Sequence, residues 1–339
     1  MGRITTAVDR AAVDSAQKVS HTFTIARVWA ILSVITAHAT FRVDNACVQD
    51  LLTSLGSIGV VMFFIISGYY FNPVKYGSLG AFLKPKVTSV LIPWLFFGTF
   101  VYVESALVMH KGLGLLAYGK FLLGHGSYLY YLTVLILCYV AYFYGVKKGR
   151  LHGLCAVSLL VTVASLQLTA WGAWDVTLIG WTDYLNPLNW IGYFCIGVWL
   201  KRADVYRLMT WCRRFLWLLL PAYGGIFALS YLLGDQMGYF GWLGMPLQLV
   251  GVMIIVGVSS FSWLDCKPLR YVSKASFGVY LLHMFSLPVV EKVLGYIPVE
   301  TFLSPLVTLA ATAAGFFVLQ VICDKIKLGK VFRLLSGVR

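Results

Sequence analysis

An arginine and a histidine stand eleven residues apart in the first long apolar run of the chain, at Arg27 and His38. Eleven residues make about three turns of an α-helix, which leaves the two side chains within roughly 20° of one face and about 16 Å apart along the axis. An ionisable group inside a membrane span is costly, and its default interpretation is functional. The pair therefore predicts a protein that acts across a membrane.

The composition predicts the fold that must position this pair. Hydrophobic residues make up 60% of the 339 residues and charged residues only 12%, about half the share in an ordinary soluble domain. We expect an all-α polytopic membrane protein with about ten transmembrane helices. The predicted spans are Phe23–Phe41, Leu51–Phe71, Val87–Met109, Ser127–Gly145, Leu151–Ala170, Pro187–Leu200, Phe215–Leu233, Trp242–Ser260, Ala275–Val290 and Phe302–Cys323.

The distribution of basic residues predicts the topology. Of the 27 Lys and Arg residues, 22 fall on the side of the termini, four fall on the other side, and Arg27 lies within a span. This positive-inside asymmetry predicts that both termini are cytosolic. Residues 1–22 are then a cytosolic tail, 23–324 the membrane domain and 325–339 a basic cytosolic tail. Topology and anionic lipids explain the net charge of +14 without a nucleic-acid partner.

The seven cysteines are scattered and have no metal-ligand spacing, so we expect no metal site. Most of them fall inside the predicted spans, where a cysteine packs as a small apolar side chain.

Five motifs in order along the chain resemble the acyltransferase 3 family of integral membrane acyltransferases. The first is an Arg and a His separated by ten residues on the first span, and the others lie on the second, third, sixth and ninth spans. The motifs are Arg27–His38, Ser57–Tyr69, Lys84–Pro93, Tyr193–Gly197 and Ser273–His283.

The resemblance implies about ten spans, a cytosolic acyl-CoA donor and O-acylation of a carbohydrate or a lipid-linked glycan. It also implies that Arg27 and His38 are essential. The chain departs from the family where Thr88 and Ser89 replace a denser basic cluster, and where Tyr128–Leu132 replaces a Trp-Phe-Leu run. No secreted esterase-like domain follows, so we expect the membrane-only form.

The chemistry of the two side chains fits such a transfer. A neutral imidazole at His38 could accept the proton of a sugar hydroxyl as general base. The Arg27 guanidinium, near the cytosolic mouth, could bind the CoA diphosphate, with the pantetheine arm directed along the helix towards His38. The alternatives are a buried histidine bonded to a neighbouring hydroxyl, and an arginine that extends to lipid phosphate.

A carboxylate is predicted at the depth of His38. Glu104 lies about seventeen residues into the third span and could orient the imidazole and stabilise its protonated form. It could equally lie at the outer interface near His110 and Lys111. Depth alone leaves both alternatives open.

Further donor contacts are predicted at the cytosolic side and in the ninth span. Lys84 and Lys86 form a basic mouth suited to CoA phosphates, although positive-inside loading explains them nearly as well. Ser67 could contact the donor, while Gly68 is interpreted as helix packing. Tyr280 and His283 share a helix face and could line a tunnel or bind the polar arm of the donor.

The outer segment 171–187 is rich in Trp and Tyr, which suit sugar rings but also populate the membrane interface. Asp175 and Asp183 are the acceptor-site candidates in it.

The overall prediction is a bacterial inner-membrane O-acetyltransferase that uses acetyl-CoA and modifies a cell-surface polysaccharide or its precursor. No serine or cysteine nucleophile is evident at the depth of His38, which favours direct transfer. The alternatives are a transporter or flippase of a glycan intermediate, a non-catalytic membrane partner, and an enzyme that transfers another acyl group such as succinyl. A transporter predicts inverted repeats or broken helices in matching halves of the chain.

Overall fold

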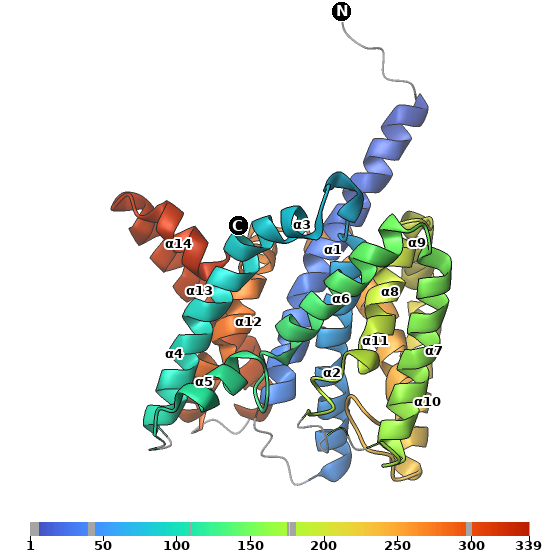
Figure 1. The fold of residues 1–339 in the computed structure, drawn as a ribbon. Helices are drawn as coiled ribbons and strands as arrows, with labels where there is room; N and C mark the ends of the chain where they lie inside the picture. Colours follow the sequence, from blue (N-terminus) through green and yellow to red (C-terminus); the bar gives the residue numbers. More distant parts are fainter. Residues whose placement is uncertain are drawn as a thin grey trace, which may run out of the picture.

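The structure is a computed structural model that describes residues 7–39, 45–108, 110, 112–174, 176, 181–295 and 300–338. Within these ranges the regular secondary structure is entirely helical (Figure 1). The helices are α1 (Ala7–His38), α2 (Ala46–Tyr69), α3 (Leu79–Lys86), α4 (Ile92–Val108), α5 (Leu115–Leu122), α6 (Tyr130–Lys147), α7 (Leu151–Ala170), α8 (Ile191–Leu200), α9 (Val205–Arg214), α10 (Leu216–Leu232), α11 (Gly244–Ser259), α12 (Lys267–Leu294), α13 (Glu300–Lys325) and α14 (Gly329–Ser336).

All ten predicted spans fall on helices, so the all-α polytopic fold is confirmed. Seven helical segments of the described chain are long and apolar enough to cross a membrane, or eight if α9 and α10, bent by 76° at their junction, count as one span. The apolar helices α8 and α11 are shorter, with 10 and 16 residues. The number of ten crossings therefore stays a prediction.

Helix α1 is the central element of the bundle. It packs against α2, α11 and α12, and it runs from the end of the molecule that carries α3 and α14 to the end that carries α5 (Figure 1). The Ser33 hydroxyl joins it to α2, because it donates to the carbonyl oxygen of Gly56 at 3.0 Å and accepts the N–H of Gly59 at 2.8 Å. Such a bond is well suited to a membrane interior, where small residues and hydroxyls hold helices together.

Helix α2 is held between α1 and α8 by close backbone contacts. A Cβ on Gly59 would collide with the carbonyl oxygen of Ala30 in α1, and a Cβ on Gly68 would collide with that of Phe194 in α8. Only glycine permits both approaches, as the packing interpretation predicts. The two contacts fix the face of α2 that carries Ser67.

The third predicted span is broken near its start. Helix α3 begins at the cap Ser78, whose hydroxyl accepts the Ala81 N–H at 3.2 Å. It continues through a π-helical turn, Val87–Leu91, into α4. Pro93 has no N–H for the carbonyl of Ser89, which removes one α-helical bond at this point. The break allows α3 to lie across the end of the bundle, with Lys84 and Lys86 in its last turn (Figure 1).

The terminal segments contain more helix than the sequence predicts. Helix α1 already begins at Ala7, and α14 lies in the segment expected to be a basic tail. The start of α1 and α14 lie at the same end of the bundle (Figure 1). An even number of crossings accounts for this arrangement, and the cytosolic assignment of that end stays a prediction.

Candidate active site

Two cavities lie at different levels of α1. Arg27 lines the first and His38 lines the second. We call them the Arg27 cavity and the His38 cavity. The eleven-residue spacing therefore places the two side chains in separate cavities that share one helix.

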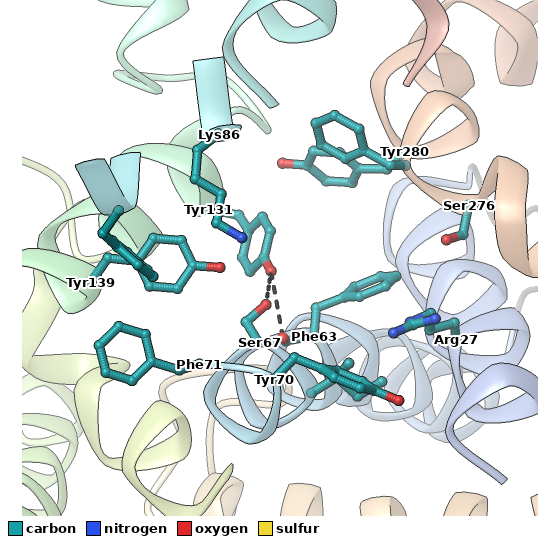
Figure 2. A pocket seen from close by; sticks show the side chains of 13 residues that line it. Arg27, Phe63, Ser67, Tyr70, Phe71, Lys86, Tyr131, Tyr139, Ser276 and Tyr280 are labelled. Atoms are coloured by element: carbon teal, nitrogen blue, oxygen red, sulfur yellow. Dashed lines mark hydrogen bonds between the residues drawn. The ribbon is translucent and has the colours of Figure 1, made fainter. Parts of the chain in front are cut away.

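The Arg27 cavity has a volume of about 410 Å³. Helices α1, α2, α3, α6 and α12 contribute its walls, and Lys86 and Arg27 enter it from opposite sides (Figure 2). It is lined by Arg27, Phe63, Ile66, Ser67, Tyr70, Phe71, Phe82, Lys86, Tyr131, Tyr139, Ser276, Phe277 and Tyr280.

The charge in this cavity is positive. The Arg27 guanidinium lies over the Tyr70 ring at 5.1 Å, and the Lys86 ammonium lies 5.5 Å from the centre of the Tyr139 ring. In the described part of the chain no Asp or Glu lines the cavity or pairs with Arg27. Aromatic faces stabilise a cation without neutralising it, so the Arg27 charge remains available to an anion.

The polar groups between the two cations are hydroxyls. Ser67 and Tyr131 share a hydrogen bond at 3.0 Å between their hydroxyl oxygens, and the Tyr131 hydroxyl also donates to the carbonyl of Phe63 at 3.5 Å (Figure 2). The Tyr280 hydroxyl donates to the carbonyl of Tyr128 at 2.5 Å. Four of the residues that were predicted to contact the acyl-CoA donor thus line one cavity, namely Arg27, Ser67, Lys86 and Tyr280.

The His38 cavity is larger, about 670 Å³. The exposed ring of His38 and the half-buried side chain of Glu104 both face it. This is one of the two positions that the residue count along the third predicted span allowed for Glu104. The other lining residues are Ala37, Val101, Ser105, Val108, Phe121, Gly124, Gly126, Ser127, Tyr128, Tyr130, Thr182, Tyr184, Tyr239, Met284 and Pro288.

No hydrogen bond or ion pair joins His38 to Glu104 within the described ranges. Two serines, Ser105 and Ser127, line the same cavity, although the sequence suggested no nucleophile at this level. The Ser127 hydroxyl donates to the carbonyl of Phe121 at 2.6 Å, so its proton is committed to the backbone.

A wall of aromatic side chains lies between the two cavities. Tyr280 and Tyr131 face the Arg27 cavity, and Tyr128 faces the His38 cavity. The fully buried His283 ring lies among them, with its centre 5.9 Å from Tyr280 and 5.2 Å from Tyr128. His283 also approaches His38, with 5.2 Å between ring centres.

Three predicted site residues lie elsewhere. Lys84 is exposed and lines neither cavity, and His283 lies within the wall instead of facing the Arg27 cavity. Asp183 does not line the His38 cavity, and its backbone carbonyl accepts the side-chain amide of Asn189 at 2.9 Å. Asp175 lies outside the described residues.

Several tyrosines of the two cavities were not predicted from the sequence, namely Tyr70 and Tyr139 in the first and Tyr239 in the second. Tyr280 was predicted, and Tyr184 lies in the aromatic segment 171–187. The Tyr128–Leu132 run was the available signal, because it carries tyrosines that face both cavities. Across the described residues no group of three or more His, Cys, Asp and Glu side chains could hold a metal ion.

A comparison with protein families identifies the class of protein. The model of the acyltransferase 3 family, described as an acyltransferase domain, matches residues 21–323. No curated protein and no solved structure matches the chain. The apolar helices and this match together define a multi-pass membrane acyltransferase. The chain belongs to the acyltransferase 3 family, and the match covers nearly its whole length.

Proposed function

We propose that the protein is an O-acetyltransferase of the bacterial inner membrane. It transfers an acetyl group from cytosolic acetyl-CoA to a hydroxyl of a cell-surface glycan or its lipid-linked precursor. The observation that carries this proposal is the pair of cavities on α1. One is basic and lacks a carboxylate among its described lining residues, and the other contains an imidazole and a carboxylate.

The Arg27 cavity has the chemistry of a site for the phosphates of acyl-CoA. A guanidinium can donate two parallel hydrogen bonds to phosphate oxygens, and a lysine supplies a second positive charge. Arg27 and Lys86 hold the phosphates in this proposal, while the hydroxyls of Ser67 and Tyr280 line the path of the donor. The pantetheine arm is of the same order of length as the separation of about 16 Å along α1. For the thioester to reach His38, the arm must pass through the aromatic wall between the two cavities, which therefore has to open during donor binding.

The His38 cavity has the chemistry of an acceptor site. Tyr130, Tyr184 and Tyr239 supply aromatic faces for a sugar ring, and Thr182 supplies a hydroxyl. His38 removes the proton from the acceptor hydroxyl while the oxygen of that hydroxyl forms a bond to the thioester carbonyl carbon. The carbon–sulfur bond then breaks, and the imidazolium returns its proton to the leaving CoA thiolate. Direct transfer needs no covalent enzyme intermediate.

The test is CoA release by the purified protein in lipid, with acetyl-CoA and a panel of glycans. Wild type is measured beside His38→Ala, and succinyl-CoA tests the acyl group. We expect acceptor-dependent release with acetyl-CoA that falls at least about 100-fold in the variant. If wild type neither binds acetyl-CoA nor releases CoA from it, the proposed function is wrong. Release that is equal in both proteins would remove His38 from the chemistry.

A further inference from the structure

His283 carries a buried nitrogen without a partner. The residue is 0% exposed, and its Nε2 atom has no hydrogen bond within the described part of the chain. A polar atom buried in this way costs free energy unless it has a use or gains a partner. Its place beside His38 points to the chemical step.

The other ring nitrogen fixes the tautomer of His283. Its Nδ1 lies 2.6 Å from the carbonyl oxygen of Tyr280. A carbonyl oxygen only accepts hydrogen bonds, so Nδ1 carries the proton. In the neutral ring, Nε2 is then an unprotonated acceptor.

The rings around His283 leave one available donor. Ring centres of Tyr128, Tyr280 and His38 lie 5.2, 5.9 and 5.2 Å from its own. The Tyr128 hydroxyl donates to the carbonyl of Leu281 at 2.6 Å, and the Tyr280 hydroxyl donates to the carbonyl of Tyr128. Both protons are committed to the backbone. Among the described residues no hydrogen bond engages the His38 ring, so its N–H is the available donor next to the His283 ring.

We infer that His283 is a positioning residue that orients His38 for catalysis. In the reacting state, a small approach of the two rings from their 5.2 Å separation lets Nε2 of His283 accept the N–H of one His38 ring nitrogen, which leaves the other His38 nitrogen unprotonated and directed to the His38 cavity. When His38 takes the proton of the acceptor hydroxyl, the same bond stabilises the imidazolium. A carboxylate does this for the histidine of a catalytic triad, and here a neutral imidazole does it.

This inference rests on the proposed function and revises the part given to Glu104. Glu104 faces the cavity but makes no hydrogen bond to His38 among the described residues, whereas His283 lies in ring contact with it. Glu104 then acts on the charge in the cavity, and His283 sets the tautomer. The donor phosphates lie in the other cavity, so loss of His283 should affect kcat and leave the KM for acetyl-CoA unchanged.

The test compares His283→Gln with His283→Asn, because the two amides replace different ring nitrogens. The longer Gln places a carbonyl oxygen near the position of Nε2, where it can accept the His38 N–H. The shorter Asn reaches only the position of Nδ1, so it can keep the bond to the Tyr280 carbonyl but offers His38 no acceptor. We expect kcat to fall about 100-fold in His283→Asn and to be largely restored in His283→Gln. Ser286→Ala, one turn further along α12, is the control and should keep the wild-type kcat.

A spectroscopic measurement separates this inference from the proposed function. Nitrogen-15 NMR of the protein labelled at histidine, in lipid, reports the tautomer of each ring without any turnover. We expect His283 to be protonated at Nδ1, and His38 to be a single tautomer in wild type and in His283→Gln but a mixture in His283→Asn. Equal kcat values for the Asn and Gln variants, or a mixed tautomer of His38 in wild type, would overturn the inference. Absence of acetyl transfer with the expected tautomers would instead contradict the proposed function.

Discussion

The Arg27 cavity and the His38 cavity differ in the chemistry that their side chains can perform. The first holds two cations over aromatic rings and has no carboxylate among its described lining residues. The second holds an imidazole, a carboxylate and several tyrosines. The difference fits the proposed division between recognition of an anionic donor in the first cavity and proton transfer from the acceptor in the second. In that proposal, helix α1 keeps the two functions at a fixed separation.

The largest effect on acetyl-CoA affinity is expected from Arg27→Ala. Loss of charge-assisted hydrogen bonds to phosphate should cost about 2 kcal/mol, or about 30-fold in the Kd for acetyl-CoA. Equilibrium binding to the protein in lipid measures it. Arg27→Lys keeps the positive charge but cannot donate the paired hydrogen bonds of a guanidinium, so it should recover part of the affinity. Unchanged binding in Arg27→Ala would make Arg27 a lipid contact instead.

Gly68→Ala should damage the Arg27 cavity through packing. A Cβ here would collide with the backbone carbonyl of Phe194, which cannot move aside like a flexible side chain. We expect a loss of about 1–3 kcal/mol in stability, seen as a lower thermal unfolding midpoint. Gly225→Ala in α10 is the matched control, because a Cβ there meets no atom within 4 Å. Equal midpoints for the two variants would contradict the packing role of Gly68.

The two lysines of α3 offer a sharper comparison. Lys86 lines the Arg27 cavity, while Lys84 is exposed and lines neither cavity. Lys86→Ala should weaken acetyl-CoA binding by about 1 kcal/mol, or about fivefold, and Lys84→Ala should leave the Kd near wild type. Similar losses in both variants would show a general effect of surface charge. A salt titration of each Kd separates that effect from direct contact.

The smallest effect is expected from Glu104→Gln. A half-buried carboxylate that acts on the His38 imidazolium through space should contribute about 0.5–1 kcal/mol, or a two- to fivefold fall in kcat. The KM for acetyl-CoA should not change, because the cations proposed to bind acetyl-CoA lie in the Arg27 cavity. Single-turnover kinetics measure the chemical step. A 100-fold fall would restore Glu104 as the direct partner of His38.

Apolar run length was sufficient to predict the helices, because each of the ten runs forms one. It could not predict the short helices α3 and α9. Helix α3 is separated from α4 by the π-helical turn before Pro93, and α9 is separated from α10 by a sharp bend. Helix length in the structure depends on such breaks and caps as well as on hydropathy. Helices α8 and α11 are also shorter than an ordinary span, with 10 and 16 residues.

Spacing on α1 and depth in α4 were sufficient to predict that Arg27 and His38 lie at different levels of one helix, and they offered the level of His38 as one of two places for Glu104. They could not predict the wall that contains His283, because that wall depends on how α6 and α12 pack against α1. Helical periodicity gives the face of each helix but not the rotation of one helix against another.

The central claim is that donor binding and chemistry are separated between the two cavities. The direct measurement is acetyl-CoA affinity and single-turnover rate, in lipid, for wild type, Arg27→Ala and His38→Ala. We predict that His38→Ala binds acetyl-CoA as wild type does but does not transfer the acetyl group. Arg27→Ala should bind weakly yet approach the wild-type rate at saturating acetyl-CoA. Equal loss of affinity in both variants would contradict the account, because it would mean that the two residues form one binding site.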